Sequence, residues 1–237
     1  MSVGMPLTGA WVGDDVAALR PDYAALLVGV DALVGGPPDA TSQGLLMAAE
    51  AYARALLAER AVEDVPAVVA WREAFRAFGA KPQRTRPSVE TLLRMAVGPG
   101  LPRVDRLTDT YNAVSVLHLL PIGGEDADAY VGPVRCVRAD GDEAFDTVAA
   151  GEPVVEHPEP GEVVWRDDAG VTCRRWNWRQ CARTRITAST TTAVFILDGL
   201  AALGHGGLHA AQAELTKSLT RLSPEARFAS RLIGPAA

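Results

Sequence analysis

Apolar residues in the first half of the chain recur mostly every three or four positions, which is the spacing of an amphipathic helix. Trp71 and Phe75 show this clearly, because they fall on one helical face. The pattern predicts helices over residues 22–33, 43–59, 66–78, 89–97, 106–118 and 208–222. Ser88 and Asp105 precede two of these ranges, and we expect each to cap the helix that follows it. Ser223-Pro224-Glu225 predicts a last short helix.

From about residue 131 the hydrophobic period changes to two, which is typical of strands. The alternation predicts strands over residues 131–137, 153–156, 162–165, 171–175 and 193–197, with a further short strand or arm around Trp11. Asp167 to Gly170 is a turn signal between two of these strands. Strands gathered in the second half, with helices before and after them, favour an α+β fold over repeated βαβ units. Because no internal repeat or low-complexity linker interrupts the chain, we expect a single domain over residues 1–237.

The composition narrows the class of protein further. The chain has 237 residues, of which 48% are apolar and 6% aromatic, and this excludes a disordered chain, a collagen and a small disulfide-rich protein. Three irregularly spaced cysteines give no disulfide framework and suit a reducing compartment. The sequence has no apolar run near the ~20 residues that span a bilayer, and its start does not resemble a secretory signal. We therefore expect a cytoplasmic protein without a membrane partner.

The net charge of −6 hides an uneven distribution. Residues 72–106 carry eight basic side chains against three acidic ones, and residues 174–185 carry five arginines and no acid. Residues 123–168, between them, carry thirteen acids against three arginines. The two basic regions would form an anion site if they met in the fold, and would otherwise be solvated surface arginines.

Common catalytic motifs do not occur in the sequence. There is no G-x-S-x-G elbow, Walker A motif or complete G-x-G-x-x-G turn. The four histidines are scattered and His118 falls on an apolar helix face, so we expect no metal and no cofactor. Cys181 lies between Arg179 and Arg183, which would favour a thiolate, but no histidine near it in the sequence would serve as its base.

Residues 173–184 remain as the densest group of functional side chains. This segment combines arginines, which suit phosphate or carboxylate binding, with tryptophans, which offer a stacking face, and an asparagine. Such a segment is typical of a binding site. The structural alternative is an edge hairpin in which a tryptophan packs on an arginine stem.

These residues also carry a resemblance to a known family. The sequence D-T-Y-N at residues 109–112 and the sequence I-T-A-S-T-T at residues 186–191 look like the D-V-T-N and V-T-x-x-T-T segments of the bacterial phenylalanyl-tRNA synthetase β subunit. With residues 100–115 and 174–184, they resemble the free-standing B3/B4-domain proteins, which are similar to the editing module of that subunit. The resemblance runs from about residue 75 to residue 200.

The resemblance implies an α+β fold in which antiparallel strands form an unusual sandwich covered by helices. In the synthetase, this module removes tyrosine wrongly attached to phenylalanine tRNA. A second hydrolytic site is needed there because binding alone discriminates poorly between similar side chains. Hydrolysis by a positioned water, with donors on the developing oxyanion, needs no covalent intermediate and would explain the lack of a nucleophile motif.

Two departures from the synthetase pattern indicate a rebuilt pocket. The synthetase has Q-P-M-H-A-F-D where this chain has L-P-I-G-G-E-D at residues 120–126, so Gly123 stands at the position of the histidine. The synthetase G-G-E segment is replaced by residues 176–183. The substrate can therefore differ from a tyrosyl-tRNA.

The resemblance implies an RNA-binding domain that acts in trans on the aminoacyl 3′ end of a tRNA and hydrolyses a mischarged ester. Asn112, Asn177 and Thr184 would then orient the ester and the water as the catalytic residues. Trp176 or Trp178 would stack on the terminal adenine or on the aminoacyl side chain. Further substrate or RNA contacts are expected from Arg84, Arg86, Arg103, Ser115, Arg179 and Arg183.

Two other hypotheses remain open on the sequence alone. One is a non-catalytic module that binds tRNA or a free amino acid, and the other is a metabolic or interaction protein that keeps only the fold. Whether the chain is an enzyme, which amino acid it would act on, whether it associates with a synthetase and its oligomeric state also stay open. Residues 103–115 and 174–184 are both rich in polar and arginine residues that packing does not need, so we expect the two segments to lie side by side and line one cleft.

Overall fold

The computed structural model describes residues 7–236, and its elements follow one another with short connections. The helices are α2 (Asp14–Leu19), α3 (Ala40–Leu56), η1 (Val62–Asp64), α4 (Pro66–Ala77), α5 (Ser88–Val97), α6 (Arg106–His118), η2 (Ala127–Ala129) and α7 (Gly204–Leu222). The strands are β1 (Trp11–Val12), β2 (Ala24–Asp31), β3 (Ile122–Asp126), β4 (Arg135–Arg138), β5 (Phe145–Ala149), β6 (Glu152–Glu156), β7 (Val163–Arg166), β8 (Val171–Arg174), β9 (Arg179–Gln180), β10 (Ala193–Gly199) and β11 (Arg227–Ile233).

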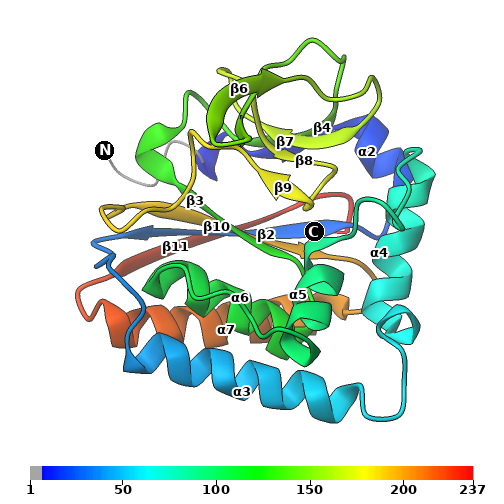
Figure 1. Ribbon diagram of the computed structural model, residues 1–237. Coiled ribbons are helices and arrows are strands. Elements are labelled where there is room, and N and C mark those ends of the chain that lie inside the picture. The colour runs from blue at the N-terminus through cyan, green and yellow to red at the C-terminus, as the bar shows by residue number, and fades with distance from the viewer. Residues whose placement is uncertain (1–6, 237) are drawn as a thin grey trace.

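Three layers make up the fold, as Figure 1 shows. The middle layer is a four-stranded antiparallel sheet in the order β11-β2-β10-β3. Helices α6 and α7 cover one face of it, and α3 packs on α6 from outside. A five-stranded sheet in the order β1-β4-β7-β8-β9 lies over the other face. The strands are mainly antiparallel and form no βαβ repeat with the helices, so the predicted α+β class is confirmed.

The two central strands of the middle sheet, β2 and β10, are buried on both faces, and the sheet divides the apolar core in two. Leu26 of β2 and Phe195 of β10 pack with helices α6 and α7 on one side. Leu27 and Ile196, their neighbours in the two strands, face the five-stranded sheet, where Trp165 of β7 packs with them. Successive side chains of a strand point to opposite faces, so each strand supplies both cores.

Strand β2 corrects the predicted helix over residues 22–33. All but one of its eight residues are buried, and it lies between β11 and β10 in the sheet. A strand covered on both faces needs no polar positions, so its sequence is a continuous apolar run without period two. That run is as compatible with a buried helix as with a buried strand.

Strand β11 corrects the short helix expected after Ser223. This strand pairs antiparallel with β2 from Arg227 to Ile233. The Ser223 hydroxyl accepts a 2.8 Å hydrogen bond from the backbone N–H of Val34, a residue far away in the chain. The serine thus satisfies a distant backbone group where a helix cap was expected.

The two expected helix caps have different outcomes. Asp105 caps α6, because its side chain accepts hydrogen bonds from the backbone N–H groups of Leu107 and Thr108. Ser88, in contrast, is the first residue of α5 and makes no cap; Pro87 occupies the cap position. The helices predicted over residues 43–59, 66–78 and 208–222 correspond to α3, α4 and α7. None of the described helices is long and apolar enough to cross a membrane.

Candidate functional site

A pocket of about 230 Å³ opens at the β3 edge of the middle sheet. Helices α5 and α6 border it on one side, and the β8–β9 connection borders it on the other, where β9 lies above the middle sheet in Figure 1. We call it the central pocket. Its lining includes Tyr111, Asn112, Glu125, Asn177, Gln180 and Asp198.

Asp198 is the most distinctive group of the central pocket. It lies near the end of β10 and only 2% of its surface is exposed. The Tyr23 hydroxyl donates a 2.6 Å hydrogen bond to Oδ1, and the Asn177 amide donates to Oδ2 at 3.5 Å. Burial raises the pKa of Asp198 to about 7, although the hydrogen bonds from Tyr23 and Asn177 counteract part of that rise. This carboxyl can therefore exchange a proton close to neutral pH.

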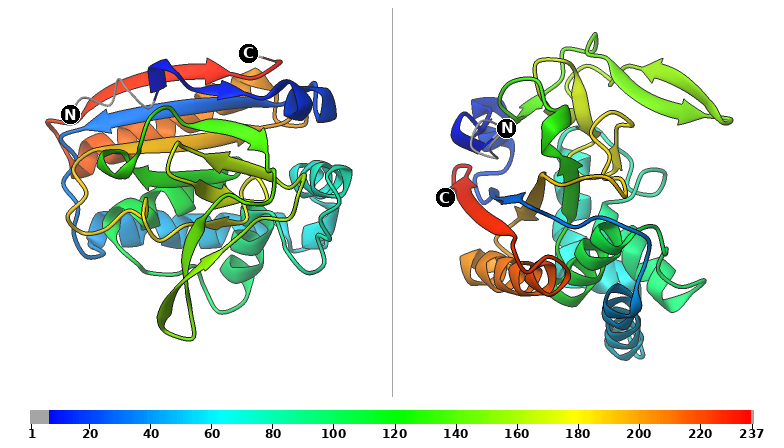
Figure 2. Two further views of the ribbon diagram at one scale, coloured as in Figure 1. Left: turned by 90° about the horizontal axis from the view of Figure 1, so that it is seen from above. Right: turned by 90° about the vertical axis from the view of Figure 1, so that its left-hand side faces the viewer.

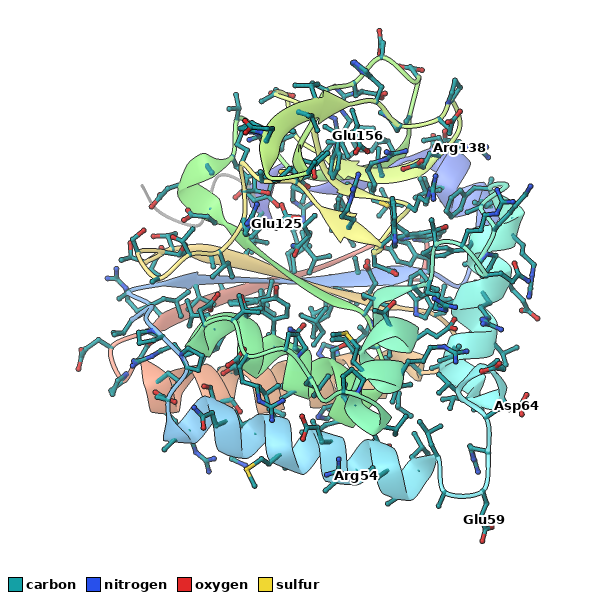
Figure 3. All side chains as sticks on the ribbon, in the orientation of Figure 1. Arg54, Glu59, Asp64, Glu125, Arg138 and Glu156 are labelled. Carbon is teal, nitrogen blue, oxygen red and sulfur yellow. The ribbon has the colours of Figure 1, made fainter. Side chains whose placement is uncertain are left out.

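Glu125 is a second buried carboxyl in the same pocket. It is 1% exposed, and it accepts hydrogen bonds from the Tyr130 hydroxyl, from Thr184 Oγ1 at 3.1 Å and from Gln180 Nε2 at 3.4 Å. Burial raises its pKa, against the effect of these donors. On the sheet, Glu125 pairs with Val194, four residues before Asp198 on β10, and points to the same face. The two carboxyls thus lie toward opposite ends of the pocket, and Figure 3 shows Glu125 between the two sheets.

Unpaired polar atoms gather around the central pocket. Nine buried side-chain nitrogen or oxygen atoms of the described residues have no hydrogen-bond partner within the protein. Five of them belong to residues that line this pocket: Ser88 Oγ, Trp165 Nε1, Trp176 Nε1, Asn177 Oδ1 and Arg179 Nε. Native interiors rarely leave such atoms unsatisfied, so a polar occupant, water or ligand, fits this site.

Five of the residues singled out in the sequence line the central pocket: Asn112, Trp176, Asn177, Trp178 and Arg179. Asn112 comes from α6 and Asn177 from the β8–β9 connection, so residues 103–115 and 174–184 contribute to one cleft as expected. Trp178 is half-buried, with the guanidinium groups of Arg175 and Arg179 over its ring at 4.7 and 4.9 Å.

Trp176 is a core residue, whereas its expected stacking role needs an accessible ring. Its side chain is 0% exposed. Its ring lies edge-on to Tyr23 at 4.8 Å and to Trp71 at 5.5 Å between centroids. Of the two tryptophans, Trp178 is therefore the one with surface available for a ligand.

The other six expected residues do not line the central pocket: Arg84, Arg86, Arg103, Ser115, Arg183 and Thr184. Ser115 is fully buried in α6, and its hydroxyl donates to the Leu120 carbonyl at 2.6 Å. Thr184 is fully buried as well and acts on the pocket through its hydrogen bond to Glu125. Arg84 lines a separate pocket between the α4–α5 loop and the β6–β7 loop.

Most of the expected phosphate-binding arginines already have acidic partners. The shortest N–O distances are 3.4 Å for Arg86–Glu90, 2.6 Å for Arg103–Glu50 and 2.8 Å for Arg183–Asp167, and Arg179 also pairs with Glu156. Glu50 and Asp167 each pair with one of these arginines. Glu90 is shared by Arg72, Arg86 and Arg94, and Glu156 by Arg174 and Arg179, so Arg86 and Arg179 are neutralised only in part. Sequence distance hides such pairs, because Arg103 and Glu50 lie on separate elements.

Asp198, Glu125 and Gln180 are pocket residues that the sequence analysis did not single out. Asp198 is a single acid at the end of a wholly apolar strand, and this position is itself a signal, because an unpaired buried acid is costly. Glu125 lies within the acidic part of the chain, so its burial could not be distinguished from that of the surface acids around it. Gln180 lies within the 173–184 segment.

The family comparison matches residues 70–204, more than half of the chain, to the model of the B3/4 domain. This chain belongs to the B3/4 domain family. The resemblance read from the sequence is thereby confirmed, and every residue that lines the central pocket falls inside the matched range.

One solved structure similar to this B3/4 protein is an N-terminal fragment of the phenylalanyl-tRNA synthetase β subunit from Pyrococcus horikoshii. The TM-score is 0.45 and the identity 13%, over 94% of this chain and 50% of the fragment. The chain thus spans half the length of that fragment. No curated protein matches the chain.

Proposed function

We propose that the central pocket receives the aminoacyl end of a tRNA and hydrolyses its ester bond, so that the B3/4 protein acts in trans as an aminoacyl-tRNA deacylase. The observation that carries the proposal is Asp198, a buried carboxyl in the pocket with a pKa of about 7. A general base works best when its pKa lies near the working pH. Membership of the B3/4 family is the second support.

The proposed reaction needs only a water molecule and the chain's own side chains. Asp198 removes a proton from the water as its oxygen bonds to the ester carbonyl carbon. The tetrahedral intermediate then expels the ribose oxygen, which takes the proton back from Asp198, and the products are a free amino acid and an uncharged tRNA. Asn177 orients the carboxyl through its amide and can turn that amide toward the developing oxyanion.

The rest of the pocket suits an aminoacyl group. In this proposal Glu125, toward the far end of the pocket, accepts the α-ammonium group of the substrate. Trp178 offers a half-buried ring to the terminal base, and Asn112 adds a polar contact from α6. In this proposal Thr184 is a positioning residue, because it acts through Glu125.

Single-turnover deacylation of a panel of charged tRNAs tests the proposal. Wild-type protein should hydrolyse at least one of them above the uncatalysed rate, and Asp198→Asn should reduce that rate by about 10²-fold or more. Asn177→Ala should reduce it by about 10²-fold while tRNA binding changes far less. Glu152→Gln, an exposed acid at the start of β6, is the control and should leave the rate unchanged. If no charged tRNA is hydrolysed above background, the enzyme proposal fails.

A non-catalytic binding module is the second candidate function. The pairing of Arg103 with Glu50 and of Arg183 with Asp167 favours it, because these two charges are already matched and attract a polyanion less. On this alternative the pocket binds a free amino acid through Glu125 and Asp198 without chemistry. Calorimetric titration with free amino acids would show binding in the absence of any hydrolysis.

A further inference from the structure

A second pocket, of about 360 Å³, lies between the α4–α5 loop and the β6–β7 loop. Its lining includes three cationic side chains, Lys81, Arg84 and Arg175, and two acidic ones, Glu159 and Glu162. We call it the basic pocket. None of the proposed catalytic groups lines it.

The two acids of the basic pocket differ in how much negative charge they present to a ligand. Glu162 is 3% exposed and is already neutralised, because Arg174 binds it through two nitrogens at 2.9 Å and Arg175 contacts it at 3.3 Å. Glu159 is exposed and pairs with no cation among the described residues. Lys81 and Arg84 likewise have no acidic partner within the described part of the chain, so their charges are available to a ligand.

The loop that carries Lys81 and Arg84 is held in one conformation by its own backbone. The N–H groups of Arg84 and Thr85 both donate to the Lys81 carbonyl, at 2.8 and 3.0 Å. The Ala80 N–H donates to the Phe75 carbonyl at 3.0 Å, which fixes the loop to the end of α4. A preordered loop loses little entropy when its cations bind an anion.

The basic pocket adjoins the central pocket through one pair of side chains. Arg175 lines the basic pocket and Trp178 lines the central one. The Arg175 guanidinium lies over the Trp178 ring at 4.7 Å. A ligand whose base stacks on Trp178 would therefore direct its backbone toward the cations of the basic pocket.

We propose that the basic pocket binds a backbone phosphate of the single-stranded RNA whose aminoacyl end occupies the central pocket. Lys81 and Arg84 supply the unpaired charge, Arg175 lies beside them in its ion pair with Glu162, and Glu159 limits the affinity. The assignment rests on the proposed function, which supplies the RNA, but the phosphate site itself can be tested without hydrolysis.

The test is calorimetric binding of a short single-stranded RNA ending in adenosine, at several salt concentrations, with inorganic phosphate as a second probe. Arg84→Gln should weaken RNA binding several-fold and reduce the slope of log K against log salt by about 0.7, the value for one lost phosphate contact on a single strand. Glu159→Gln should tighten binding, because it removes the free negative charge. Arg60→Gln is the control. In Figure 3 the neighbouring Glu59 lies at the opposite end of the molecule from Glu156, the last residue of β6, which precedes the β6–β7 loop of the basic pocket.

The outcomes separate the two proposals. If RNA binds and its binding is weakened by Trp178→Ala but not by Arg84→Gln, the phosphate site is wrong and the proposed function stands. If phosphate binds in a manner that depends on Arg84 while the RNA does not bind, the basic pocket is an anion site but its assignment to RNA is wrong. If neither probe binds, the inference is overturned.

Discussion

The hydroxyl of Tyr23 donates a 2.6 Å hydrogen bond to Oδ1 of Asp198, and both side chains are almost completely removed from solvent. Tyr23 precedes β2 and Asp198 lies near the end of β10, so this bond ties the two central strands of the middle sheet together at the pocket. Trp176 packs edge-on against the same tyrosine. The candidate base is thus held by the core of the protein, and its position does not depend on a loop.

The burial of Asp198 should make the stability of the protein depend on pH. Its pKa is about 7 in the folded protein and about 3.9 in an unfolded chain, so between these values the folded state binds more protons. The free energy of unfolding should therefore fall as the pH rises from about 4 to about 7, by at most ~1.4 kcal/mol per pH unit from this group.

Urea unfolding at pH 5 and pH 8 measures this effect, and Asp198→Asn isolates it. The variant keeps an oxygen for the Tyr23 hydroxyl, and Asn177 can turn its unpaired Oδ1 toward the new amide. The free energy of unfolding of the variant minus that of wild type should then be more positive at pH 8 than at pH 5, because only wild type loses stability as Asp198 ionises. Equal differences at both pH values would contradict the raised pKa.

The rate of deacylation should follow the ionisation of Asp198. Only the deprotonated carboxyl can accept a proton from water, so the enzymatic rate should rise about tenfold per pH unit below about pH 7 and level off above it. Because the ester also hydrolyses spontaneously in alkali, the rate without protein is subtracted at each pH. A rate independent of pH between 5 and 7 would exclude Asp198 as the base.

Gly123 and Gly124 are neighbours on β3 that should respond differently to alanine. A Cβ at Gly124 would lie 2.7 Å from the Tyr111 ring and 2.8 Å from Ile186, both in the core under the sheet. Overpacking of this kind costs about 1–3 kcal/mol. A Cβ at Gly123 would meet only the amide of Gln180, at 3.1 Å, on the pocket side.

We therefore expect Gly124→Ala to lower the urea midpoint clearly and Gly123→Ala to leave it nearly unchanged. Gly123→Ala should instead weaken ligand binding, because it displaces Gln180 into the central pocket. Similar loss of stability in both variants would mean that the strand is not oriented with Gly123 toward the pocket.

The sequence predicts an element well where a polar face or a cap marks it, whereas a continuous apolar run fits both a buried helix and a buried strand. Helix α4 was found because one of its faces is polar. Helix α6, which α3 covers from outside, was found from its apolar spacing and from the Asp105 cap at its start. Strand β2 was mistaken for a helix because sheet pairing and helix packing bury the same apolar run. Only the pairing partners, which are distant in sequence, distinguish the two.

The candidate site divides in the same way. Asn177 belongs to a segment whose density of polar groups marks a site, and Asn112 was expected from the family resemblance; both line the central pocket. Asp198 was missed, because its role depends on how deeply it is buried, which the sequence does not state. The acidic partners of Arg103 and Arg183 lie far away in the sequence, so the sequence does not reveal these ion pairs.

The β5–β6 hairpin, which projects from the body of the protein in Figure 2, should be stabilised by a change in its turn. Ala150 and Gly151 form a two-residue loop with φ values of +52° and +88°, the signature of a type I′ turn. Alanine is strained at positive φ, whereas asparagine tolerates it. Ala150→Asn should slow amide exchange in the hairpin, and Gly151→Ala should accelerate it, with a cost of about 1 kcal/mol. Slower exchange in Gly151→Ala would contradict the turn type.

Arg183 should contribute to the free energy of unfolding, whereas an exposed arginine that only binds phosphate would contribute little. It binds Asp167 through two nitrogens at 2.8 and 2.9 Å, and Asp167 is 0% exposed. That carboxylate also accepts the backbone N–H groups of Val131, Ala169 and Gly170, so it fixes the β7–β8 turn and the segment before β4. Removal of the guanidinium would leave a buried charge without its counter-ion.

Arg183→Ala should therefore lower the free energy of unfolding by about 3 kcal/mol, as expected when one partner of a buried ion pair is removed. The double variant Arg183→Ala/Asp167→Asn should recover part of this loss, because the asparagine keeps an acceptor for the backbone without the charge. Arg84→Gln, in the basic pocket, should leave the midpoint of urea unfolding unchanged. If Arg183→Ala is as stable as wild type and instead weakens RNA binding, then the Asp167 ion pair contributes little, and Arg183 is the phosphate ligand that its sequence context suggested.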